Sequence, residues 1–78
     1  MPRIQGILRA GDKTVMVLDG SFRVSFDEPV MINGSVFHAI PPSGSIDDSF
    51  AIADREIKSL PSSFFIGSTV ERIKQPSG

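Results

Sequence analysis

The fold is decided by residues 14–40, which read TVMVLDGSFRVSFDEPVMINGSVFHAI. Two glycine turns lie in this stretch, Asp19-Gly20 and Asn33-Gly34, and each is flanked by runs rich in Val, Ile and Phe. Asp-Gly and Asn-Gly favour the type I′ turn of a two-residue β-hairpin, because both central residues need positive φ angles. The stretch therefore predicts four antiparallel strands in meander order.

The turns also set which residues face one another across each hairpin. In the second hairpin, Met31 is expected to face Val36. In the first hairpin, Val17 is expected to face Phe22, which assigns this face of the strands to the core. The predicted core consists of positions that share this facing, together with apolar residues of the flanking segments: Ile4, Leu8, Val15, Val17, Phe22, Val24, Phe50, Ile57 and Ile66.

A helix is expected between residues 45 and 60, after the proline-rich turn that ends the meander. Its apolar residues recur at intervals of three and four, and Ser45 with Asp48 resembles a capping box. Pro61 would end this helix. A short strand over residues 49–52 is the alternative interpretation of the segment.

Two more strands are expected outside the meander. Residues 3–9 alternate as a first strand, and residues 63–73 read as a C-terminal strand with a bulge at Gly67. The predicted fold class is therefore a β-rich α+β domain: an antiparallel meander of four strands, one short helix and a C-terminal strand. It would form a small barrel or a sheet with one helix. We expect one domain, residues 1–78, with a frayed tail over residues 74–78.

Composition narrows the classes of function. The chain has no cysteine and a single histidine, His38, which argues against a cysteine nucleophile and against a zinc site. We therefore expect no enzymatic activity, no metal and no cofactor. The longest apolar runs are four residues, too short to span a bilayer, and no signal-peptide pattern is visible. We expect a cytoplasmic protein with no membrane partner and no small-molecule substrate.

Two sets of residues are candidates for protein binding. The uncharged run Phe64, Phe65 and Ile66 places apolar side chains on both faces of a strand, and exposed aromatic side chains are typical interface anchors. The second set is Met16 and Leu18, on the face of their strand opposite the expected core. The sequence thus favours a non-catalytic protein–protein interaction module, such as a small adaptor, inhibitor or assembly subunit. Self-association is also expected, because so short a chain has a thin core.

A nucleic-acid-binding function is the alternative. Arg3, Arg9 and Arg23 could share one exposed sheet face that binds anionic ligands, as in a single-strand-binding β-barrel of the OB or SH3-like type. The aromatic stacking partners are missing from that face. The net charge of −1, from eight basic and nine acidic residues, also disfavours nucleic acid as a partner.

Overall fold

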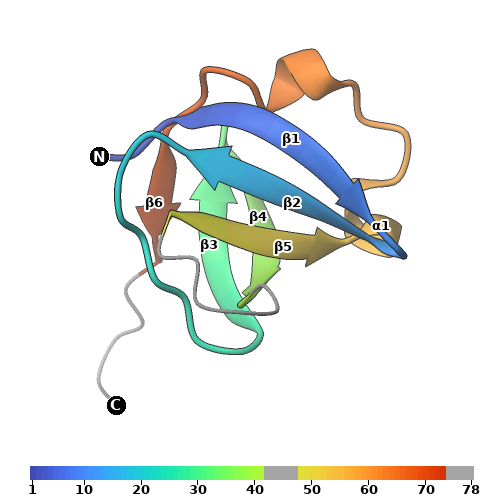
Figure 1. Cartoon of the computed structure of the whole chain (residues 1–78), viewed down its shortest axis with the longest axis horizontal. Helices are drawn as coiled ribbons and strands as arrows, with labels where there is room; N and C mark the ends of the chain where they lie inside the picture. Colours follow the sequence, from blue (N-terminus) through green and yellow to red (C-terminus); the bar gives the residue numbers. More distant parts are fainter. Residues whose placement is uncertain (42–47, 74–78) are drawn as a thin grey trace.

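The computed structural model describes residues 1–41 and 48–73, which form a curved antiparallel sheet of six strands with one short helix (Figure 1). The strands are β1 (Ile4–Ala10), β2 (Lys13–Leu18), β3 (Glu28–Ile32), β4 (Ser35–Ile40), β5 (Ser49–Ala53) and β6 (Val70–Arg72). Helix α1 (Asp54–Ile57) and a 3-10 turn, η1 (Ser62–Phe64), lie between β5 and β6. The predicted fold class, β-rich with one short helix and a C-terminal strand, is confirmed.

The strand order in the sheet is β1-β2-β5-β4-β3-β6. The chain leaves β2, crosses to β3, and returns through β4 to place β5 beside β2, which is a Greek-key arrangement rather than a simple meander. A single bridge between Arg3 and Thr69 brings the start of β1 to the chain before β6. Among the described residues the remainder of β1 pairs only with β2, so the sheet is not closed into a barrel.

The hairpin at Asn33-Gly34 forms as predicted. Asn33 has a φ of 50° and Gly34 a φ of 82°, the positive values that a type I′ turn needs. Met31 faces Val36 in the resulting β3–β4 pair, which is the register that the turn implies.

The predicted hairpin at Asp19-Gly20 is wrong. Asp19 instead bonds to the chain before β1: its N–H donates to the Arg3 carbonyl at 3.1 Å, and its carboxylate accepts the Arg3 N–H at 2.8 Å. The end of β2 is thereby tied to β1, and residues 21–26 form a loop instead of a strand. Phe22 still reaches the core, where its ring lies 6.0 Å from that of Phe50.

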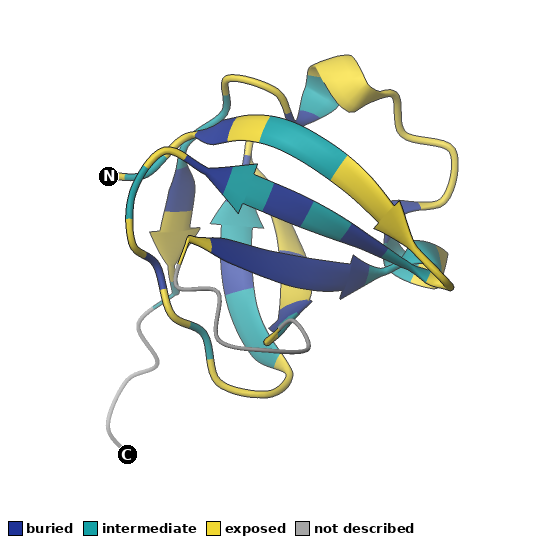
Figure 2. Cartoon of the chain, viewed as in Figure 1, coloured by how far each residue is buried: buried dark blue, intermediate teal, exposed yellow. Residues whose placement is uncertain are grey.

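The facing of β2 is the reverse of the prediction. Met16 is completely buried, as is Leu18, whereas Val15 and Val17 are half-buried on the outer face. The facing of β1 is also reversed after a bulge at Gln5, because a register shift of one residue moves every later side chain to the other face of the sheet. Of the predicted core, Ile4, Phe22, Phe50 and Ile57 are buried, Val15, Val17 and Val24 are half-buried, and Leu8 and Ile66 are exposed (Figure 2).

The long helix predicted for residues 45–60 is also wrong, and the alternative strand over residues 49–52 is confirmed. All four of these residues are buried, because β5 lies between β2 and β4 and packs on both faces. Helix α1 follows it and ends at Lys58, which has a φ of 55°. The expected cap at Ser45 lies outside the described residues.

Only the second half of the predicted C-terminal strand is a strand. The first half forms η1 and a loop that turns at Gly67, where φ is 85°. Phe65 enters the core, with its ring 5.5 Å from that of Phe37, and Phe64 packs against it half-buried.

Alanine substitutions on the two faces of β2 test this facing. We expect Met16→Ala to reduce the free energy of unfolding by about 2–5 kcal/mol, because it leaves a cavity in the core. Val15→Ala, on the outer face, should cost about 1 kcal/mol or less. Urea denaturation of both variants measures the difference. An equal or larger loss for Val15→Ala would contradict the reported facing.

Candidate functional site

The residues that the sequence singled out for protein binding are dispersed by the fold. The side chains of Met16, Leu18 and Phe65 are buried in the core. Phe64 is half-buried beside them. Ile66 is 45% exposed in the loop before β6.

The three arginines assigned to an anionic-ligand face do not gather on one face. Arg3 precedes β1 and Arg9 lies near its other end, about 20 Å away at the usual rise of a strand. Arg23 lies in the β2–β3 loop rather than on a strand beside β1. Arg9 also has a partner, since its guanidinium lies 2.9 Å from the carboxylate of Asp54.

His38 joins β4 to α1 through a single carboxylate. The Glu56 Oε1 atom lies 3.0 Å from His38 Nδ1 and accepts the His38 backbone N–H at 3.1 Å. The hydrogen bond and the negative charge of Glu56 raise the pKa of His38 above its usual value. This contact gives the His38 backbone N–H a partner beyond the end of the β4–β5 ladder and ties β4 to α1.

The described residues show neither a metal site nor a membrane-spanning helix. Residues 1–41 and 48–73 contain no group of three or more His, Cys, Asp or Glu side chains placed to hold a metal ion. Within those same ranges, none of the helical segments has the length and apolar character needed to cross a membrane.

One edge of β1 carries backbone groups that point away from the sheet. The N–H of Leu18 donates to the Asp48 carbonyl on the β5 side. Every second residue of β2 therefore directs its backbone N–H and C=O groups to β5, and the residues between them direct theirs to β1. The β2 residues that face β1 pair with Gly6 and Leu8. The intervening residues Ile7 and Arg9 therefore direct their N–H and C=O groups outward.

The open edge of β1, at Ile7 and Arg9, begins after the last residue of β1 that forms backbone hydrogen bonds on this side of the strand. Closer to the N-terminus, Ile4 donates to the Ser68 carbonyl at 3.0 Å and accepts the Gly67 N–H at 2.8 Å. Beyond Ile4, no backbone hydrogen bond joins this side of β1 to another described segment. An exposed edge of this kind is a template for pairing with another chain.

A pocket of about 210 Å³ lies beside the open edge of β1 and is lined by β1, β2, α1 and the chain from α1 to η1. We refer to it as the β1 pocket. Its apolar lining residues are Ile7, Ile57, Leu60 and Phe65, and its polar ones are Arg9, Thr14, Lys58 and Ser62.

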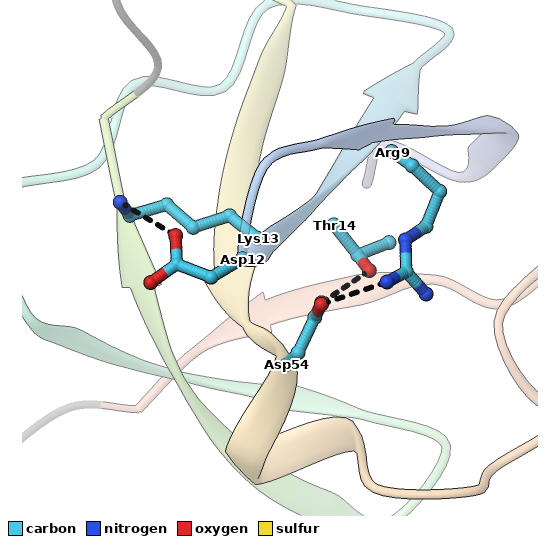
Figure 3. A network of polar contacts seen from close by, with 5 residues as sticks. All are labelled: Arg9, Asp12, Lys13, Thr14 and Asp54. Atoms are coloured by element: carbon cyan, nitrogen blue, oxygen red, sulfur yellow. Dashed lines mark hydrogen bonds and ion pairs between the residues drawn. The ribbon is translucent and has the colours of Figure 1, made fainter.

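One side of the β1 pocket is held by Asp54, the first residue of α1 (Figure 3). Its carboxylate accepts a hydrogen bond from the Arg9 guanidinium at 2.9 Å and from the Thr14 hydroxyl at 3.0 Å. Its backbone N–H donates to the Asp12 carbonyl at 3.0 Å. These contacts fix α1 against the β1–β2 turn and position the Arg9 side chain, which remains 73% exposed, at the pocket rim.

The rim of the β1 pocket is positively charged. Lys58 lies at the end of α1 and is exposed, and its ammonium group forms no ion pair within the described part of the chain. Arg9 and Lys58 together outweigh the single negative charge of Asp54. The pocket can therefore accept an apolar side chain on its floor and a carboxylate at its rim.

Sequence reasoning singled out Arg9 for its charge and Ile57 for its helical spacing, but did not place them together. It missed the roles of Ile7, Lys58 and Leu60. The signal at Lys58 was absent, because a helix that ends at a non-glycine residue with positive φ is not marked in a sequence. The signal at Ile7 was hidden by the bulge at Gln5.

Neither the family models, nor the curated proteins, nor the solved structures with which the chain was compared include a match to it.

The contact between His38 and Glu56 predicts a pH effect with a definite sign. The raised pKa of His38 means that the contact stabilises the fold fully below the unfolded-state pKa of about 6.5. This stabilisation is lost as the pH rises through the folded-state pKa. NMR titration of the single imidazole should show that Glu56→Gln lowers its pKa, while the control Glu71→Gln does not. The same His38 pKa in the Glu56→Gln variant and the wild type would refute the assignment.

Amide hydrogen exchange tests the open edge of β1 directly. We expect the amides of Gly6 and Leu8, which point to β2, to exchange more slowly than those of Ile7 and Arg9. The difference should be about ten-fold or more, since each 1.4 kcal/mol of opening free energy slows exchange ten-fold. Residue-resolved NMR exchange measures it. Protection at Ile7 and Arg9 in the free monomer would show that the edge is already covered.

Proposed function

We propose that this protein is a non-catalytic interaction module that binds an extended segment of another protein chain along the open edge of β1. The observation that carries the proposal is the position of the β1 pocket directly beside that edge. An added strand would gain main-chain hydrogen bonds from Ile7 and Arg9. Its alternate side chains would point to one face, which lets one of them enter the pocket.

The lining of the β1 pocket indicates the chemistry of the bound segment. Ile7, Ile57 and Phe65 favour an apolar side chain on the floor. The guanidinium of Arg9 and the ammonium of Lys58 favour an acidic side chain or a terminal carboxylate next to it. The expected ligand is therefore an extended peptide in which an apolar residue adjoins an acidic one.

The chemistry available at the β1 pocket supports binding rather than catalysis. Its Thr14 hydroxyl is engaged with the carboxylate of Asp54, and no imidazole lines the pocket. A nucleophilic mechanism needs a nucleophile with an adjacent base and an orienting group, and the lining residues do not supply that set. Binding through one pocket and the short strand edge at Ile7 and Arg9 is expected to be weak and reversible.

The nucleic-acid alternative has less support. Arg3 and Arg9 lie at opposite ends of β1, and Arg9 is paired with Asp54. Phosphate binding draws on several basic side chains along one surface, with aromatic rings between them. The net charge of −1 further reduces the expected attraction to a polyanion.

Selection from a displayed library of random peptides, followed by calorimetry on the selected peptides, tests the proposed function. Selected peptides should share an apolar residue next to Asp or Glu. Lys58→Glu should weaken their binding about ten-fold, since it replaces a favourable charge by a repulsive one. The matched control Lys13→Glu changes the same charge on β2, outside the pocket, and should leave affinity unchanged.

A second variant tests the edge at Ile7, both its outward N–H and its pocket-lining side chain, separately from the charge. Ile7→Pro removes an outward N–H without breaking the β1–β2 ladder, so it should abolish binding while amide exchange still reports a folded sheet. The proposal would be contradicted by a selection without enrichment, or by selected peptides that bind Lys58→Glu and Lys13→Glu equally well.

A further inference from the structure

Phe26 is an aromatic side chain that the fold leaves in solvent. It lies in the loop over residues 19–27 between β2 and β3, and 77% of it is exposed. The other phenylalanine rings of the described residues are buried or half-buried. A large apolar side chain presented in this way is a typical anchor for a protein interface.

The loop that carries Phe26 is braced on both sides of it. Ser25 and Glu28 exchange two hydrogen bonds: the Ser25 N–H donates to the Glu28 carboxylate at 2.8 Å, and the Glu28 N–H donates to the Ser25 carbonyl at 3.2 Å. Arg72 of β6 contacts the Glu28 carboxylate and the Arg23 carbonyl. The loop therefore holds Phe26 outward on a fixed base.

A further contact secures the base of the loop. The guanidinium carbon of Arg72 lies 4.7 Å from the centre of the Phe22 ring, which packs on the core. Ordering the loop in the free protein reduces the entropy that Phe26 would lose on binding.

Phe26 cannot reach the β1 pocket of its own chain. In Figure 1 the β2–β3 loop runs down the left side to the bottom of the molecule, whereas α1, η1 and the chain between them lie at the right and upper right. The molecule measures 36 Å along its longest axis, which is horizontal in that view. A contact between Phe26 and a β1 pocket must therefore involve two molecules.

The two surfaces are complementary in shape and in charge. The β1 pocket of about 210 Å³ exceeds the roughly 150 Å³ that is enough to hold benzene in an apolar cavity. Its rim carries Arg9 and Lys58, while Phe26 is followed by the exposed carboxylate of Asp27. An apolar ring next to an acid is the chemistry that the pocket is expected to select.

We propose that Phe26 of one copy occupies the β1 pocket of a second copy, with Asp27 beside the Lys58 ammonium. This inference rests on the proposed function of the β1 pocket and names a second copy of the chain as a partner. The contact is heterologous, since different surfaces of the two copies meet. Each added copy leaves one free Phe26 and one free pocket, so association continues head to tail as concentration rises.

Sedimentation velocity over a concentration series tests this arrangement with two variants. Phe26→Ser removes the ring and keeps the pocket. Leu60→Glu places a negative charge in the pocket lining and keeps the ring. The average mass of the wild type should rise with concentration, whereas each variant alone should remain a monomer. The control Leu8→Ser, at an exposed residue outside the pocket, should associate like the wild type.

Mixing the two variants gives the decisive result. Phe26→Ser supplies an intact pocket and Leu60→Glu supplies an intact ring, so an equimolar mixture should form dimers and nothing larger. A wild type that is monomeric at every concentration, or a Phe26→Ser variant that associates like the wild type, would overturn the inference. Assembly of the wild type without dimers in the mixture would also overturn it.

The proposed function is judged separately. If the wild type stays monomeric but selected peptides bind Phe26→Ser with unchanged affinity, the self-association fails and the proposed function stands. If the variants form the mixed dimer while no peptide distinguishes Lys58→Glu from Lys13→Glu, the pocket serves self-association and the general peptide-binding function fails.

Discussion

The candidate site depends on the alternation of hydrogen bonds along β2. Because Leu18 donates toward β5, every second residue of β2 directs its backbone groups to β5, and the residues between them direct theirs to β1. This alternation fixes which backbone groups of β1 point away from the sheet. The Greek-key crossing gives β2 both of its neighbours and leaves β1 at the edge. The outward groups of Ile7 and Arg9 are thus a consequence of the topology, and they exist whatever the side chains are.

The selectivity proposed for that edge depends on side chains, and Asp54 connects these side chains to the strands. It begins α1, bonds to Thr14 on β2, and orients Arg9 on β1, so one carboxylate places the helix and a charged group of the rim together. The same contact commits Asp54 to β1 and β2. Lys58, four residues later, forms no ion pair within the described part of the chain and lies at the rim of the pocket.

Local features of the sequence predict local structure, and long-range contacts decide the rest. The Asn33-Gly34 turn specifies its hairpin because both φ angles are set within two residues. Asp19-Gly20 has the same turn signal, but two hydrogen bonds to Arg3, distant in sequence, override it. Residues 49–52 show no alternation that would mark a strand, because the segment is buried on both faces, so the helical spacing of residues 45–60 is the stronger signal. Met16 faces inward although its neighbours are equally apolar, so the hydrophobic pattern could not decide which face of β2 is buried. The pocket could not be predicted without the strand order.

The proposed function requires that another chain adds to β1 as a strand. Intermolecular nuclear Overhauser effects between an isotope-labelled protein and a selected unlabelled peptide detect such a strand. We expect close contacts from the peptide backbone to the backbone protons of Ile7 and Arg9, with an apolar peptide side chain near Phe65. Contacts confined to another surface, such as the outer side of β4 near Val36, would contradict it.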